Sequence, residues 1–517
     1  MHVTKIYTRT HARRSLFHTA FFRGMSQIAT MLSYIVLVRA MTEAEFGIFN
    51  LMYAVLPVVS AVASFGLDQT LKRFQPEYLR AGNSLAAHRL FRVIGLSRFG
   101  ATAAVLAILL LAWNSFAPHF GLAPYRWQFM MFCFIVLLHF QVNIHQISLA
   151  SHMLHRFSVG MLAAMALTKL VAYSVLAALG RLDLETAILA DTLGYGVAWV
   201  GLRYAHRKQC PAPEGVQQFR FDTKERRRLM RFGFFNNLND AGVLGLNARI
   251  DNFFIAALMN TVAVGAYAFY TRLVFMTQRL LPIRMFENVV QPMFFSIPLT
   301  EAAERTPRYF TALLNTSLIV QLPMTAFVTA YHQEIVNVLF GGKFLEHSWL
   351  LPMIFAFATI NVVAIPVTLV AQHAERSALL FVSKVFAIYN IAGLLIFVPI
   401  WGVYGAAFAT GTAEVFKNLF VWWHIRHHAR WLNGWSVLGL TVLVWGPTIG
   451  LAYGLKETLN APPILDLAAG AALFVISSLI FIRSPALSKT DRQVLASVLH
   501  GKEARALRWL GLLPAQS

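Results

Sequence analysis

The sequence predicts an all-α polytopic membrane protein with about fourteen transmembrane helices, arranged as two six-helix bundles and two further C-terminal helices. Of its 517 residues, 57% are hydrophobic and only 13% are charged, whereas about a quarter of the residues of a soluble domain are charged. Apolar segments of about 20 residues, long enough to cross a bilayer as helices, recur along the chain. The distribution of Lys and Arg between the connecting segments places both termini in the cytoplasm.

Fourteen apolar segments are long enough to span the membrane. Their approximate cores are residues 17–39, 46–66, 92–113, 127–150, 157–179, 184–204, 232–258, 262–283, 309–331, 347–370, 379–399, 402–423, 434–454 and 463–483. With a cytoplasmic N-terminus, the cytoplasmic connections hold most of the 44 Lys and Arg residues. One missed span would reverse the side of every later loop, so this asymmetry supports the count. It also explains the net charge of +21 without a nucleic-acid partner.

A weak internal repeat predicts how the spans are grouped. MTEAEFG (41–47) joins the first two spans and MNTVAVG (259–265) joins the seventh and eighth, each with a capping Thr or Asn after Met and a closing Gly. Parallel repeats of this kind place a transporter's substrate site between two bundles. The predicted parts are a six-helix bundle at 1–208, a basic cytoplasmic linker at 209–231, a second six-helix bundle at 232–430, two extra spans at 431–485 and a cytoplasmic amphipathic tail at 486–517.

Polar side chains inside apolar spans are the candidate substrate contacts. At 100° per residue, four polar residues of the seventh span fall within about 60° of one another and form one polar stripe: Asn236, Asp240, Asn247 and Asp251. Arg23 and Gln27 share a face of the first span, and Arg272 and Arg279 share a face of the eighth. Charged groups at this depth normally face protein or a hydrated cavity. They could line a central cavity or hold the helices together through interhelical hydrogen bonds, and both interpretations remain open.

Other ionisable residues suggest coupling to an ion gradient. Asp191 in the sixth span is a candidate proton or cation site, together with Asp240 and Asp251. Lys169, in the fifth span, suits either a functional role or a helix–helix salt bridge. Arg98 lies near the cytoplasmic end of its span and is expected to reach the interface with its long side chain.

Several site classes have no signature in the chain. It lacks the GxxxxGK[ST] loop of an ATPase and the HExxH and CxxC metal motifs, so neither a cofactor nor a metal is predicted. Cys133 and Cys210 lie in an apolar segment and a basic loop, which does not suit a disulfide. His145 and His152 share a helical face, which indicates helix packing.

Three runs of residues resemble the Wzx-type polysaccharide flippases, a branch of the multidrug/oligosaccharidyl-lipid/polysaccharide exporter superfamily. The first run contains Glu45-Phe46-Gly47 and then Phe65-Gly66-Leu67. The second is ARIDNFFIAALMNTVAVGAYAFYTRLV, and the third is VPIWGVYGAAFATGTAEVF. The resemblance extends thinly over residues 15–430.

This resemblance implies a flippase that moves undecaprenyl-pyrophosphate-linked sugars across the bacterial inner membrane by alternating access. Arg23 and Arg272 fit the positions of cavity arginines in related lipid flippases. A polysaccharide polymerase and a chain-length regulator are the implied partners, besides the lipid-linked sugar and membrane lipid. Two alternatives stay open: a cation-coupled multidrug exporter of the same fold, and a membrane polymerase or glycosyltransferase. Short external loops argue against the second alternative.

Overall fold

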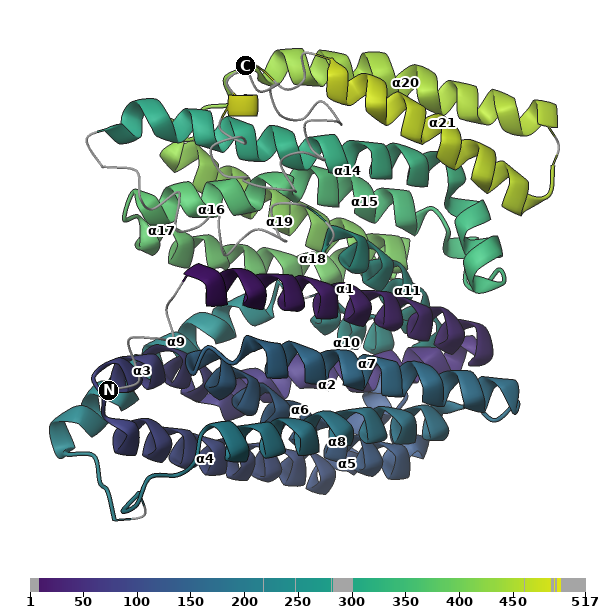
Figure 1. Cartoon of the computed structure of the whole chain (residues 1–517). Coiled ribbons are helices and arrows are strands. Elements are labelled where there is room, and N and C mark those ends of the chain that lie inside the picture. The colour runs from purple at the N-terminus through teal and green to yellow at the C-terminus, as the bar shows by residue number, and fades with distance from the viewer. Residues whose placement is uncertain are drawn as a thin grey trace. The chain divides into compact units, whose positions relative to one another are not determined.

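The computed structural model describes residues 9–216, 218–246, 248–279, 281, 301–459, 461–484, 488 and 491–493. All regular structure in these residues is helical, and no strand occurs among them. This confirms the predicted fold class. The chain forms two compact units, Met1–Gly265 and Ala266–Ser517 (Figure 1). The predicted amphipathic tail lies almost entirely outside the described residues.

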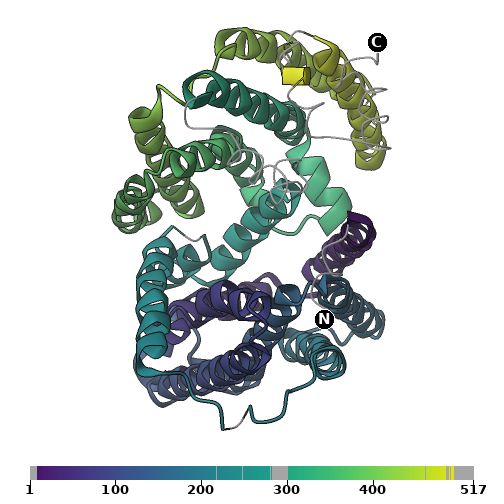
Figure 2. The ribbon, with the colours of Figure 1, turned by 60° about the vertical axis from the view of Figure 1, so that its left-hand side comes forward.

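The first unit is a bundle of long helices joined by short turns. Its helices are α1 (Arg9–Ala40), α2 (Glu43–Ser64), α3 (Leu67–Arg80), α4 (Ser84–Leu111), α5 (Trp113–Phe116), η1 (Ala117–Phe120), η2 (Ala123–Tyr125), α6 (Arg126–Ser151), α7 (His155–Ala178), α8 (Leu184–Gln209), α9 (Thr223–Leu244) and α10 (Ala248–Leu258). Helix α7 packs against α1 and α8, α6 packs against α4 and α8, and α2 packs against α4 and α10 (Figures 1 and 2).

Helix α2 begins and ends at local signals in the sequence. Thr42 caps its first turn in a capping box with Glu45: the Glu45 amide donates to the Thr42 hydroxyl, and the Thr42 amide donates to the Glu45 carboxylate. The helix ends where Phe65 and Gly66 both adopt left-handed backbone angles, with φ of 46° and 67°. Asn260 plays the matching role at α11 (Thr261–Gln278), where its side chain accepts from the Ala263 amide. The prediction that Thr42 and Asn260 cap their helices is therefore confirmed.

Helix α3 lies against the start of α9 through an ionic and aromatic contact. Arg228 on α9 donates to Glu77 on α3 at 2.8 Å, and this hydrogen bond holds the pKa of Glu77 below its ordinary value. The Tyr78 hydroxyl donates to Glu225 at 2.5 Å. Burial, followed by this hydrogen bond, raises the pKa of Tyr78. The basic end of the predicted linker thus forms the first turns of α9 and is bound to α3.

The seventh predicted span is not one continuous helix. Helix α9 ends at Leu244 and α10 begins at Ala248, so the helical register is interrupted between them. The polar stripe of the seventh span was predicted from a constant rotation of 100° per residue along one helix. Because the helix is interrupted, this rotation does not relate side chains on α9 to side chains on α10. Asn236 and Asp251 therefore belong to separate helices. Discontinuous helices of this kind are common where transporters bind substrates or ions.

The second unit contains the remaining helices. These are most of α11, then α14 (Ala302–Phe340), η4 (Leu345–His347), α15 (Leu350–Ile360), η5 (Asn361–Val363), α16 (Ala364–His373), α17 (Ser377–Val382), η6 (Ser383–Val385), α18 (Phe386–Trp401), α19 (Val403–Ile425), α20 (Gly434–Leu459) and α21 (Pro463–Arg483). Helix α14 bends at Tyr331, and Lys456 of α20 lies 4.5 Å from the Tyr331 ring while pairing with Glu334 at 2.7 Å. The two C-terminal helices are thereby joined to the bend in α14.

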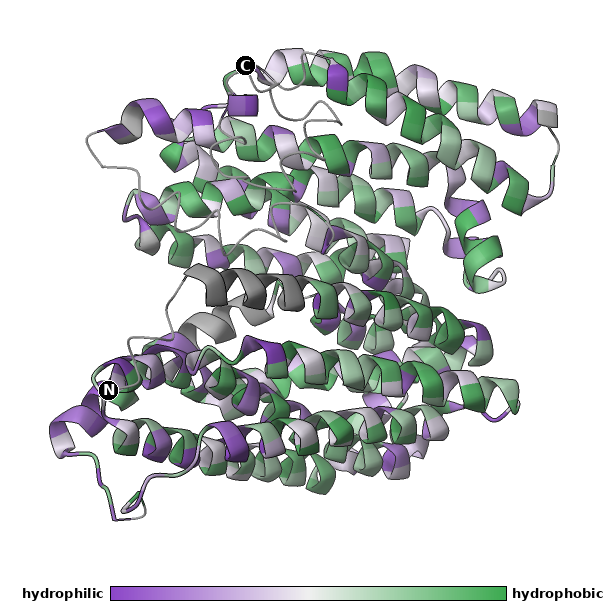
Figure 3. Ribbon diagram, in the orientation of Figure 1, coloured by the Kyte–Doolittle hydropathy of each residue, from purple (hydrophilic) through white to green (hydrophobic). Residues whose placement is uncertain are grey.

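Apolar residues recur along most of the length of the long helices (Figure 3). Ten helical stretches of the described residues are long and apolar enough to cross a membrane. Among the described residues, each of the fourteen predicted spans contains helical residues, although the count of fourteen stays a prediction. Leu111 and Trp435 are 87% and 90% exposed, which suits contact with lipid and not with water. The protein is a multi-pass membrane protein.

Candidate functional site

A buried ion pair joins α7 and α8 inside the first unit. The Lys169 ammonium lies 2.8 Å from a carboxylate oxygen of Asp191, whose residue is 3% exposed. The Tyr173 hydroxyl donates to the same carboxylate at 2.6 Å, and the Tyr53 hydroxyl of α2 donates to its other oxygen. Two helices, α7 and α2, thus supply donors to one buried carboxylate on α8. Such a charge is tolerated away from water only when it is paired and hydrogen-bonded in this way.

Aromatic and imidazole groups extend this cluster toward α6. The Lys169 ammonium lies 4.2 Å from the centre of the Tyr195 ring, within the range of a cation–π interaction. The Tyr195 hydroxyl lies 3.3 Å from Nδ1 of His139 on α6. Residues 191 and 195 are four apart on α8, so both side chains point to the same side of the helix. We call these six residues the Asp191 cluster: Tyr53, His139, Lys169, Tyr173, Asp191 and Tyr195.

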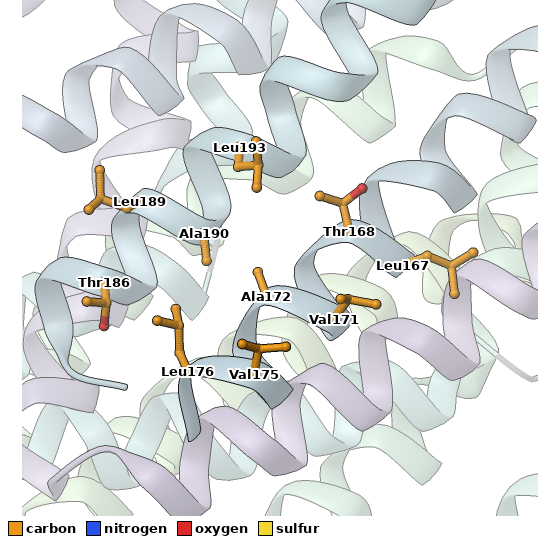
Figure 4. A pocket seen from close by; sticks show the side chains of 10 residues that line it. All are labelled: Leu167, Thr168, Val171, Ala172, Val175, Leu176, Thr186, Leu189, Ala190 and Leu193. Atoms are coloured by element: carbon orange, nitrogen blue, oxygen red, sulfur yellow. The ribbon is translucent and has the colours of Figure 1, made fainter. Parts of the chain in front are cut away.

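A groove between α7 and α8 lies beside the Asp191 cluster. Its volume is about 680 Å³, within the usual range for small-molecule sites. Leucine, valine, alanine and threonine side chains from both helices point toward it (Figure 4): Leu167, Thr168, Val171, Ala172, Val175, Leu176, Thr186, Leu189, Ala190 and Leu193. Its lining contains no charged residue, so it suits hydrocarbon and offers nothing to hold a pyrophosphate.

A second buried charge lies at the junction of four helices. Arg98 of α4 is fully buried, and its Nε lies 3.7 Å from Asp68 of α3. Its Nη2 donates to Ser60 of α2 at 3.3 Å, and its guanidinium carbon lies 4.1 Å from the centre of the Phe140 ring of α6. Asn143 donates to the other oxygen of Asp68 at 3.1 Å. This pair is as enclosed as Lys169–Asp191, and it involves the helix that follows the Phe65-Gly66 turn.

The expectation that Arg98 reaches the interface is wrong. Its side chain has no exposed surface because Asp68, Ser60 and Phe140 enclose it. Two of its nitrogens, Nε and Nη1, have no hydrogen-bond partner, and neither does the nearby Thr102 hydroxyl. Only the fold reveals this arrangement, because Asp68 and Arg98 are 30 positions apart and on different helices.

The predicted cavity residues of the first span take different environments. Arg23 is exposed and Gln27 is half-buried on α1, the helix that packs against α7. Asn236 uses its amide to donate to the carbonyl of Phe232, four residues back in the same helix, at 2.9 Å. Its amide nitrogen is therefore bonded within its own helix, and this bond is not one of the interhelical hydrogen bonds of the packing interpretation. Arg23 retains an exposed guanidinium.

The remaining predicted residues are placed as follows. Arg272 is half-buried on α11, and Arg279, in the turn directly after this helix, is exposed with its guanidinium carbon 4.6 Å from the centre of the Phe275 ring. Asp251 is fully buried in α10, the helix that packs against α2. Asn247 and the side chain of Asp240 lie outside the described residues. These residues lie in both units and two of their side chains are outside the described residues, so their assignment to one site stays a prediction, whereas the structure does join Asp191 to Lys169.

The described part of the chain contains no cluster of three or more His, Cys, Asp or Glu side chains placed to hold a metal ion. Cys133 and Cys210 are both buried free thiols. The described site therefore contains ion pairs, tyrosine hydroxyls and a histidine. Such groups can bind or release protons and small cations. It also presents an apolar groove.

The comparisons with known proteins agree on class and fold. The family described as polysaccharide biosynthesis protein matches residues 13–297. A lipid II flippase, MurJ in an inward closed conformation, has a TM-score of 0.67 at 12% identity, covering 90% of this chain and 98% of its own.

Two MATE structures share the fold. A MATE family transporter of the MOP superfamily in an inward-facing conformation has a TM-score of 0.63 at 13% identity, covering 78% of this chain and 95% of its own. A MATE protein in a bent conformation has a TM-score of 0.55 at 13% identity, covering 80% and 94%. No curated protein sequence matches the chain. Because the family match spans more than half of its residues, this chain belongs to the polysaccharide biosynthesis protein family.

Proposed function

We propose that this protein is a flippase that moves polyprenyl-pyrophosphate-linked oligosaccharides across the bacterial inner membrane. The family match over residues 13–297 carries the proposal, because it ties a polytopic membrane protein to polysaccharide assembly. The fold shared with a lipid II flippase along 98% of that protein supports a lipid-linked cargo. The product would feed exopolysaccharide, capsule or O-antigen assembly, with a polymerase and a chain-length regulator as partners.

Transport would proceed by alternating access, driven by an ion gradient. Asp191 is the first candidate for the coupling site, because it is the buried carboxylate on which Lys169 and two tyrosines converge. Asp251 and Asp240 are further candidates. The substrate contacts we assign are Arg23, Gln27, Asn236, Asn247, Arg272 and Arg279. Arginine suits a pyrophosphate because its guanidinium binds phosphate oxygens through paired hydrogen bonds.

A second candidate is a cation-coupled multidrug exporter. The observation that favours it is the fold shared with a MATE transporter at a TM-score of 0.63. A lipid-linked sugar remains the better proposal, because the sequence-family match is to polysaccharide biosynthesis.

The decisive experiment measures the leaflet on which polyprenyl-linked sugars accumulate. Cells with and without the gene are compared, with polymerisation blocked in both. We expect accumulation on the cytoplasmic leaflet only in the deletion strain, with outer-leaflet sugars restored by the intact gene. An unchanged leaflet distribution in a strain without a second flippase would refute the proposal and bring drug export forward.

Replacing Arg23 or Arg272 by alanine is expected to lower transport while folded protein remains in the membrane. A hydrogen bond to a charged group contributes about 1.5–3 kcal/mol, so each loss should slow transport by about tenfold or more. The readout is the same leaflet measurement, with protein abundance checked in membranes. Arg181→Ala is the matched control, because Arg181 is an exposed arginine in the short α7–α8 connection. Normal transport by both variants would remove these arginines from the substrate contacts.

A further inference from the structure

Four histidines from three helices converge in the first unit, apart from the Asp191 cluster. His206 of α8 is 5% exposed, and its ring centre lies 5.8 Å from those of His88 of α4 and His145 of α6 and 6.2 Å from that of His152. Phe91 of α4 stacks on His206 at 4.2 Å with an angle of 22°. We call the four histidines the His206 cluster. They lie at the predicted cytoplasmic ends of α4, α6 and α8.

A chain of hydrogen bonds links His206 to α6 and α3. Gln75 of α3 donates to the Ser148 hydroxyl oxygen at 2.8 Å, and that hydroxyl lies 2.9 Å from Nε2 of His206. A serine hydroxyl has one proton and two acceptor lone pairs, so Nε2 accepts from Ser148 when it carries no proton and donates to Ser148 when it does. A proton added at Nε2 therefore reverses the direction of this hydrogen bond.

The other groups around His206 add no negative charge that would stabilise an imidazolium. Helix α4 contributes His88 and Arg92, α6 contributes His145 and His152, and α8 itself contributes Arg203 near His145. One ring nitrogen of His145 and one of His152 already donate to backbone carbonyls. Nδ1 of His145 donates to the Gln141 carbonyl and Nδ1 of His152 donates to the Ser148 carbonyl, both at 2.8 Å.

The neighbouring helices α3 and α7 do not supply a negative charge that would offset a protonated His206. On α3, Gln75 is uncharged and Glu77 is bound to Arg228. On α7, His155 is half-buried and lies near Arg23. Protonation would therefore place like charges together at the junction of three helices, where they would repel one another.

We propose that the His206 cluster is a proton-sensitive lock, which holds the cytoplasmic ends of α4, α6 and α8 together near neutral pH and releases them when the cytoplasm acidifies. His206 stacks on Phe91 and hydrogen-bonds Ser148 across the helix junction, and protonation of the histidines places like charges there that repel one another. The lock is formed by side chains of the first unit, and it does not depend on which cargo is transported. It gives the protein a response to cytoplasmic pH that is separate from any coupling at Asp191.

The direction of the pH effect follows from the protonation of His206. Burial, followed by the neighbouring histidines, lowers the pKa of His206 from 6.5 to about 3, and burial also lowers the pKa of His152. The released state, with His206 in water, would regain the ordinary value and bind protons more tightly. Lowering the pH from 7.5 to 5 should therefore shift the ratio of locked to released protein about 30-fold toward release. The shift begins near pH 6.5 and continues as the pH falls toward 3.

The test is a distance measurement between spin labels on α4 and α8 of the full-length protein in nanodiscs. Ser84 and Lys208 are exposed positions near the ends of these helices. They would be labelled after replacing Cys133 and Cys210 by alanine. In otherwise unmodified protein, a population with a longer distance is expected to appear reversibly between pH 7.5 and 5. His427→Gln, which removes an exposed histidine of the second unit, should behave in the same way.

His206→Phe keeps an aromatic ring against Phe91 but cannot be protonated, so it should lose most of the pH-dependent change. If that variant does not fold, His206→Gln provides a second side chain that does not titrate. A distance distribution that is unchanged from pH 7.5 to 5 in the labelled parent protein overturns the proposal without any variant. So does an equal pH response in the parent and in the folded His206 variant.

Discussion

Lys169→Met is expected to destabilise the first unit by about 3–5 kcal/mol, the usual cost of removing one partner of a buried ion pair. Asp191 would then keep its charge at 3% exposure with only the two tyrosine hydroxyls as donors. The free energy of unfolding of the purified protein, measured in detergent with a denaturant series, checks this. Asp191→Leu should be similarly damaging, because it leaves the ammonium buried.

The double variant Lys169→Met/Asp191→Leu should recover much of that loss, since replacing both charges by apolar groups of similar size is often neutral or stabilising. The double variant also distinguishes a structural role of the ion pair from a role in ion coupling. If Asp191 exchanges the coupling ion, the double variant should fold and still lose gradient-driven flipping. A stable double variant with full, gradient-dependent transport would reduce the pair to a structural role.

Gly66→Ala is expected to be the most damaging single methyl addition at the junction of α2 and α3. Gly66 has φ of 67°, and a methyl group there would overlap the carbonyl group of Gly233 in the middle of α9. The overlap is with backbone, so no side-chain rotation relieves it. Close packing of this kind makes overpacking cost about 1–3 kcal/mol, added to the left-handed backbone cost of about 1–2 kcal/mol.

Gly82→Ala is the matched control for this prediction. Gly82 has a similar φ of 73°, but a methyl group there meets nothing within 4 Å. The loss of stability in Gly82→Ala therefore measures the backbone cost alone. The additional loss in Gly66→Ala measures the cost of the overlap with α9. The yield of folded protein and its thermal unfolding temperature are the readouts. Equal losses in both variants would show that the Gly66–Gly233 approach contributes nothing.

The helices could be predicted from the sequence because their signals are local. An apolar segment of about 20 residues in a membrane must form a helix to satisfy its own backbone groups. Thr42 and Asn260 cap their helices through residues three positions away. His145 and His152 were expected to serve helix packing, and both contact His206. Asp191 could be singled out because a carboxylate inside an apolar span is costly wherever it points.

The sequence by itself thus determined the fold class, the membrane setting and the identity of the residues that need partners. The tertiary structure decided which partners they have: Lys169 for Asp191, Asp68 for Arg98, and three further histidines for His206. It also decided that the seventh span breaks between Leu244 and Ala248, which separates residues that one continuous helix would have aligned. The physical reason is the range of the interactions. Helix formation depends on residues a few positions apart, whereas the burial and pairing of a charge depend on helices that only the folded chain brings together.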